Sequence, residues 1–151
     1  MDIKLDDLSG PEIAVFLEAH LQDMKATSPP ESKHALDLEG LRQPEVTFWT
    51  VWEQGTLIGC GAIKALDADH GEIKSMRTAP TYRGRGVASR LLQHILQEAR
   101  QRGYGRLSLE TGSMVFFEPA RRLYAKHGFE ECPPFGDYWA DPNSVFMTRT
   151  L

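Results

Sequence analysis

The sequence has few cysteines, no excess of basic residues and no long hydrophobic run. Two cysteines among 151 residues are too few for a disulfide framework, and we expect Cys60 and Cys132 to be reduced thiols. Lys and Arg number 17 against 21 Asp and Glu, and this balance argues against binding nucleic acid through the overall field. The apolar runs fall far short of the ~20 residues that a membrane-spanning helix needs. Because the acidic start is unlike a secretory signal, the expected compartment is the cytoplasm.

The length and the histidine spacing limit the organisation further. A chain of 151 residues with 41% hydrophobic residues can form a core without a metal or disulfide, and no repeat or linker divides it. We therefore expect a single domain over residues 1–151. No histidine has partners at the spacing of a metal site, so we predict no metal.

The spacing of apolar residues predicts the order of helices and strands. Helical spacing follows residue 11, recurs at about 34–41, follows Gly86 and returns from about Pro119 to Lys126. Alternating patterns predict strands at about residues 3–5, 47–53, 56–63, 71–78, 106–111, 129–132 and 145–150. The order β-α-α-β-β-β-α-β-α-β-β predicts an α/β (α+β) fold, with a mixed sheet of six to seven strands flanked by about four helices.

A glycine-rich turn joins the strand that ends near Thr78 to the helix that begins near Val87. A helix N-terminus presents unpaired N–H groups and the positive end of the helix dipole, and glycines let an anion approach them closely. The turn Arg83-Gly84-Arg85-Gly86 therefore predicts a phosphate or pyrophosphate site. It is not a P-loop, because no Gly-Lys-Ser/Thr follows, and the third glycine of the dinucleotide fingerprint is missing.

This turn resembles the pyrophosphate loop of the GCN5-related N-acetyltransferase (GNAT) superfamily, Arg/Gln-x-x-Gly-x-Gly/Ala, here at Arg83, Gly86 and Ala88. Residues 120–129 resemble the second signature of the superfamily, Ala-x-x-Leu-Tyr-x-x-x-Gly-Phe. The resemblance covers nearly the whole chain and implies the GNAT fold. Phe117 is a departure, since many members carry asparagine there for the cofactor's pantetheine arm. A narrower resemblance is to small bacterial acetyltransferases, some labelled as acting on indole-acetic acid.

The resemblance implies that the chain is an N-acetyltransferase with acetyl-coenzyme A as co-substrate. It implies that an amine attacks the thioester directly in a ternary complex, with the backbone N–H of Met76 stabilising the oxyanion. No acyl-enzyme is expected, because neither cysteine has a base nearby in sequence. The residues expected to bind acetyl-coenzyme A are Met76, Arg77, Thr78, Arg83, Gly84, Arg85, Gly86, Val87 and Ala88.

Acetylation of an amine requires removal of a proton, because an alkylammonium with a pKa near ~10.4 is almost wholly protonated at pH 7. Glu72 is the first candidate for the general base, since histone acetyltransferases of the superfamily carry a catalytic glutamate at the same offset before the loop. It could instead face solvent or pair with Lys74 or Arg77. Glu110 is the second candidate, and it could instead bind the cation of the substrate. Tyr124 matches the family tyrosine that protonates the leaving thiolate, its alternative being a core aromatic.

The sequence says less about the acetyl acceptor. In this fold the acceptor site is shaped by the two N-terminal helices and the late loops. The candidates there are His20, Met24, Ser28, His34, Tyr138 and Trp139. We expect a small amine or an amino-acid-like metabolite, with a protein or peptide acceptor as one alternative and a non-catalytic acyl-coenzyme A sensor as another. A homodimer is compatible with this fold.

Overall fold

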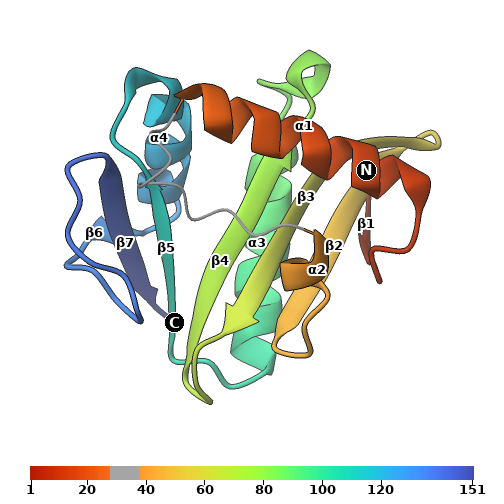
Figure 1. Cartoon of the computed structure of the whole chain (residues 1–151). Coiled ribbons are helices and arrows are strands. Elements are labelled where there is room, and N and C mark those ends of the chain that lie inside the picture. The colour runs from red at the N-terminus through yellow and green to blue at the C-terminus, as the bar shows by residue number, and fades with distance from the viewer. Residues whose placement is uncertain (28–37) are drawn as a thin grey trace.

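The computed structural model of the chain describes residues 1–27 and 38–151. Its centre is a seven-stranded mixed sheet in the order β1-β2-β3-β4-β5-β7-β6 (Figure 1). The strands are β1 Asp2–Leu5, β2 Val46–Glu53, β3 Thr56–Ala65, β4 His70–Thr78, β5 Arg106–Gly112, β6 Glu130–Glu131 and β7 Ser144–Thr150. The described helices are α1 Pro11–Thr27, α2 Leu38–Leu41, α3 Val87–Gln101 and α4 Glu118–Lys126, with short 3-10 turns at Pro80–Tyr82 and Val115–Phe117. The predicted α/β class and mixed sheet are confirmed.

The helices cover both faces of the sheet. In Figure 1, α1 crosses one face and α3 lies behind the other. Leu91, Leu92 and Ile95 of α3 form one buried cluster with β-strand residues and with Tyr124 of α4. Ile13 and Leu17 of α1 recur at helical spacing, which buries them in a second cluster with strand residues on the opposite face.

The strands before the glycine-rich turn form an antiparallel meander, and the strand after α3 adds in parallel. Strands β1 to β4 pair antiparallel in sequence order, and β5 pairs parallel to β4 and antiparallel to β7. The β2–β3 turn contains Gln54 and Gly55 at φ of 50° and 79°, the conformation that a two-residue hairpin requires.

The sheet is split between β4 and β5. Within the described residues, their ladder runs only from His70↔Arg106 to Ile73↔Leu109, although both strands continue. Strand β4 bends beyond this ladder through a bulge at Ser75, whose φ is 57°. The thiol of Cys60 donates to the Ser75 carbonyl at 3.2 Å. The divergent ends of β4 and β5 leave an opening in the middle of the sheet.

Candidate active site

Two cavities meet at this split in the sheet. The larger, of about 650 Å³, runs along the end of β4, the turn after it and α4. The smaller, of about 110 Å³, lies where the β4–β5 ladder ends, and it is lined by residues 72–76 of β4 and by Glu110 and Thr111 of β5. Six residues line both cavities and so mark the place where they join: His20, Met24, Met76, Phe117, Ala120 and Tyr124.

The turn after β4 shapes one end of the larger cavity. Gly84 and Gly86 have φ of 79° and 81°, in the left-handed region that glycine adopts without strain. Gly86 is the N-cap of α3, so the first turn of that helix, from Val87 to Ser89, borders the cavity. The unpaired N–H groups of a helix N-terminus attract anions there. From this region the lining residues are Met76, Arg77, Thr78, Tyr82, Arg83, Gly84, Gly86, Val87, Ala88 and Ser89.

Eight of the nine residues predicted to bind acetyl-coenzyme A are therefore in the lining, and Arg85 is not among them. Its guanidinium lies 5.0 Å from the centroid of the Tyr82 ring. The sequence interpretation did not include Ser89 or Lys126, which also line the cavity. Ser89 had a local signal, because it lies in the first turn of the helix that the glycines begin.

The other end of the larger cavity is mainly apolar. Its walls there include Phe116, Phe117, Leu123 and Tyr124. A cavity with a helix N-terminus and arginines at one end and apolar walls at the other fits a molecule with a pyrophosphate and a slender arm. Phe117, which replaces the asparagine of many superfamily members, cannot offer that arm an amide and contributes ring surface instead.

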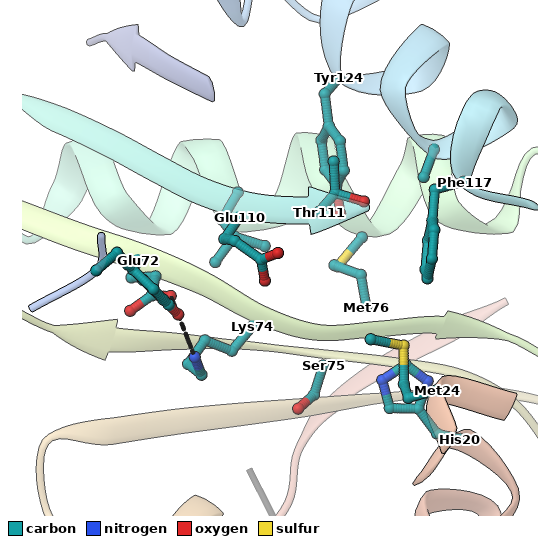
Figure 2. A pocket seen from close by; sticks show the side chains of 13 residues that line it. His20, Met24, Glu72, Lys74, Ser75, Met76, Glu110, Thr111, Phe117 and Tyr124 are labelled. Atoms are coloured by element: carbon teal, nitrogen blue, oxygen red, sulfur yellow. Dashed lines mark hydrogen bonds and ion pairs between the residues drawn. The ribbon is translucent and has the colours of Figure 1, made fainter. Parts of the chain in front are cut away.

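Tyr124 stands at the junction of the two cavities. It is 6% exposed and packs edge-to-face on Phe129, and burial raises the pKa of its hydroxyl. Figure 2 shows Tyr124 reaching down from α4 toward the space beside Met76, and His20 and Met24 approaching from α1. The hydroxyl is thus kept protonated at the junction of the two cavities.

The smaller cavity carries a compact group of polar side chains. The Lys74 ammonium lies 3.1 Å from Glu72 Oε2 and donates to the Tyr138 hydroxyl at 3.0 Å. The Tyr138 hydroxyl in turn donates to the same carboxylate oxygen of Glu72. Glu72 is only 3% exposed, so these two donors supply the contacts that a buried carboxylate needs. Burial raises the pKa of Tyr138, and Glu72 adds to that rise.

Glu110 lies beside this group with a different environment. Burial raises its pKa from 4.5 to about 7, and the charges of Glu72 and Asp141 act in the same direction, while Lys74 opposes them. In Figure 2, the Glu110 side chain lies between Glu72 and the group formed by Met76 and Tyr124. Its carboxyl can therefore exchange a proton near neutral pH.

Helix α1 closes the site from the other side. Asp23 accepts a hydrogen bond of 2.6 Å from Arg77, whose guanidinium also lies 5.4 Å from the centroid of the Phe16 ring. Burial lowers the pKa of His20 to about 4, so its imidazole is neutral at physiological pH. These contacts fix the last turns of α1 over the end of β4.

The structure brings some of the predicted acceptor residues together and leaves others apart. His20, Met24 and Tyr138 line the smaller cavity. Trp139 is 61% exposed and lies outside the lining of both cavities. Ser28 and His34 fall outside the described residues. In the described part of the chain, no group of three His, Cys, Asp or Glu residues could hold a metal ion. Over the same residues, no helix is long and apolar enough to cross a bilayer.

The sequence matches the family described as Acetyltransferase (GNAT) family over residues 13–129. The chain belongs to this family. The resemblance predicted from the loop and from residues 120–129 is thus confirmed, and the chain is an enzyme of the N-acetyltransferase type. The N-acetyltransferase YsnE of Bacillus subtilis is 60% identical over the full length of both chains. The IAA acetyltransferase of Azospirillum brasilense is 43% identical over 89% of this chain and 86% of its own.

Solved structures of the family have the same fold. The GNAT family acetyltransferase of Elizabethkingia anophelis, solved with acetyl-CoA bound, is similar over 99% of this chain and 97% of its own. Its TM-score is 0.68 at 17% sequence identity, and at that identity the likeness concerns the fold.

Proposed function

We propose that this GNAT enzyme transfers the acetyl group of acetyl-coenzyme A to the amine of a small molecule, by direct attack in a ternary complex. The observation that carries the proposal is the meeting of two cavities at the β4–β5 split. A partly buried carboxyl with a pKa of about 7 lies on one side of their junction, and a protonated tyrosine lies at the junction itself. One cavity accommodates the donor and the other the acceptor.

The donor side of this proposal rests on the larger cavity. Acetyl-coenzyme A supplies an activated acetyl group as a thioester. Its pyrophosphate would lie against the first turn of α3, where Gly84 and Gly86 keep the backbone open and Arg83 adds positive charge. The carbonyl oxygen would accept from the backbone N–H of Met76, which follows the bulge at Ser75 and borders both cavities.

We assign the general base to Glu110 in preference to Glu72. A base works best when its pKa lies near the working pH, and Glu110 meets that condition. Glu72 would first have to give up its contacts with Lys74 and Tyr138. Glu110 also lies nearer the junction, because it follows the last β4–β5 pair whereas Glu72 precedes it.

In the proposed reaction, one C–N bond forms and one C–S bond breaks. The acceptor's ammonium group gives up two protons in all. Glu110 takes the first and passes it to solvent, which leaves a neutral amine to attack. Tyr124 donates a proton to the leaving sulfur and recovers one from the nitrogen. After these transfers, Glu110 and Tyr124 have returned to the protonation states in which they began.

The test is a thiol-release assay with acetyl-coenzyme A over a broad library of small amines, with peptides as a separate arm. We expect acceptor-dependent release of coenzyme A and a mass gain of one acetyl group on a small amine. Transfer to peptides alone would favour a protein acetyltransferase. Cofactor binding without transfer to any acceptor, unaffected by substitutions at Glu110 and Tyr124, would favour an acyl-coenzyme A sensor and refute the proposal.

A second measurement tests whether Glu110 is the general base. In Glu110→Gln, kcat/KM should fall by about 10²- to 10⁴-fold, and the acidic limb of its pH profile should disappear. The matched control is Glu118→Gln, since Glu118 lies on the exposed face of α4 in a loose pair with Arg122. An acidic limb that persists in Glu110→Gln would exclude Glu110 as the base.

A further inference from the structure

The smaller cavity is lined by a group of polar side chains that lie at different depths in the sheet. The group consists of Glu72, Lys74, Glu110 and Tyr138. Strand residues alternate between faces, and Ile73 and Leu109 belong to the core cluster under α3. Their neighbours Glu72, Lys74 and Glu110 therefore face the opposite side, that of α1. In the register, Glu72 is level with Ser108, while Lys74 and Glu110 follow the last pair. Glu72 thus lies deeper in the sheet, and Glu110 lies at the opening.

Tyr138 connects this arrangement to a distant part of the chain. It comes from the segment between β6 and β7, and its ring packs edge-to-face on Phe135 at 5.2 Å and against Phe146 at 5.5 Å. Its hydroxyl accepts from Lys74 and donates to Glu72, so the three polar groups close into a triangle. The aromatic packing therefore holds the Glu72–Lys74 ion pair in one geometry.

The charges that face Glu110 come from several elements. Lys74 and Glu72 act from β4, and Asp141 acts from the segment before β7. The Ser144 hydroxyl of β7 lies beside the carboxyl, and the neutral imidazole of His20 approaches from α1. Of these groups, Lys74 is the cation that favours ionised Glu110, and its charge is offset by the Glu72 partner at 3.1 Å.

We propose that Glu72 and Lys74, locked together by Tyr138, are positioning residues that set the pH at which Glu110 works as the base. Glu72 performs this task as the fixed counter-ion of Lys74. Removing Glu72 takes away a negative charge that acts on Glu110 and that offsets the charge of Lys74, and Glu110 then ionises at lower pH. This inference rests on the proposed function, because it takes Glu110 to be the base.

The test compares pH profiles of kcat/KM for the wild type, Glu72→Gln and the double variant Glu72→Gln/Lys74→Met. In Glu72→Gln, we expect the acidic limb to move to lower pH by about one unit, as when a like charge is removed from beside a carboxyl. In the double variant the limb should move back toward the wild-type position, because both charges are gone. A merely structural role would lower activity without this reversal. Glu118→Gln again serves as the control, and the acidic limb of its pH profile should stay at the wild-type position.

A direct titration keeps the test independent of activity. The carboxyl of Glu110 can be followed by ¹³C NMR in each variant, assigned from the signal that is lost in Glu110→Gln. The pH midpoints of these titrations should follow the same order as the acidic limbs, with the lowest midpoint in Glu72→Gln. If Glu72→Gln abolishes the limb and nearly all activity, Glu72 is itself the base and the inference is wrong. An unmoved midpoint in both variants would also overturn it, whereas a wild type without any transfer would overturn the proposed function instead.

Discussion

Glu72 and Glu110 lie on neighbouring strands and face the same side of the sheet, but their surroundings give them different chemistry. Glu72 is held by an ammonium and a phenol. Burial raises the pKa of Glu110 to about 7, and the charge of Lys74 opposes that rise only in part. One carboxyl is thereby fitted to hold a charge in place and the other to exchange a proton.

The raised pKa of Glu110 predicts a pH-dependent stability. Its folded pKa of about 7 lies above the ordinary 4.5, so folding favours the protonated form. Its stabilising contribution is complete below pH 4.5 and is lost as the pH rises through 7. Glu110→Gln cannot ionise, so its free energy of unfolding should rise relative to the wild type across this window, by on the order of 2 kcal/mol. Urea unfolding of both proteins at pH 4.5 and pH 8 measures the change.

Glu118→Gln provides the comparison for this stability experiment, because its side chain is about half exposed and should show no such window. A constant difference between Glu110→Gln and the wild type from pH 4.5 to 8 would mean that the Glu110 carboxyl is not perturbed in the folded protein.

Sequence reasoning found both glutamates and placed Glu72 first, whereas we propose Glu110 as the base because burial raises its pKa to about 7. The glycine-rich turn into α3 could be predicted because its signal is contiguous, from Arg83 to Ala88. The contact between Tyr138 and Glu72 joins residues 66 positions apart, and the segment around Tyr138 has no periodicity that would place it. The burial of Glu110 likewise depends on strands and helices that meet only in the fold. Long-range contacts of this kind leave no local pattern.

At the scale of elements, the turn into α3 depends on backbone conformations that only its glycines adopt freely. Gly86 caps α3 at φ 81°, and an alanine there would be strained although its Cβ would meet no atom within 4 Å. We expect Gly86→Ala to lower stability by about 1 kcal/mol and to raise the KM for acetyl-coenzyme A at least tenfold, since the first N–H groups of α3 would turn away. Steady-state kinetics and thermal unfolding measure the two effects.

Gly103 offers a matched control for the substitution at Gly86. It follows the other end of α3 at φ 84°, also with open space around the Cβ position, and it lies outside the lining of both cavities. Gly103→Ala should lower stability by a similar amount while leaving the KM for acetyl-coenzyme A unchanged. Equal effects of both variants on KM would contradict the phosphate-loop assignment.

The bulge in β4 is a second feature of element scale, and the sequence did not predict it. Ile73 and Met76 both pack against the core cluster under α3, although three positions separate them, because the bulge at Ser75 inserts an extra residue. The alternating pattern of residues 71–78 predicted the strand, and β4 His70–Thr78 confirms it. The residue type at position 75 did not indicate a bulge, since Ser75 is neither glycine nor proline.

Gly61 leaves room for Met76 after this bulge. A Cβ at Gly61 would lie 2.4 Å from Met76 Sδ, so Gly61→Ala should push the Met76 side chain and reduce kcat about tenfold by disturbing the junction of the cavities. Gly71→Ala is the control, because its Cβ would meet Ile63 and Leu107 at 3.0 Å, away from both cavities. Both variants should lose about 1–3 kcal/mol of stability. If kcat falls equally in both, crowding at Met76 is not the cause.

At the scale of the whole molecule, the split sheet joins two cavities, which fits the proposed direct transfer between two bound substrates. The larger cavity runs along the end of β4, the first turn of α3 and α4, and the smaller one lies on the face that carries Glu110, so the proposal has donor and acceptor bound together. The cysteines are poorly suited to carry an acetyl group. Cys60 is fully buried, and burial raises the pKa of its thiol to about 12. Cys132 is not among the described residues that line either cavity.

This arrangement predicts a sequential mechanism. Initial rates measured with both substrates varied should give intersecting double-reciprocal lines, because both must be bound before the acetyl group moves. Intact-mass spectrometry after incubation with acetyl-coenzyme A alone should show no acetylated enzyme, and Cys132→Ser should retain the wild-type kcat. Parallel lines, together with a mass gain of one acetyl group that the acceptor removes, would mean that a side chain carries the acetyl group between the cavities. Direct transfer requires instead that Met76, Tyr124 and Glu110 surround one reacting centre at the β4–β5 split.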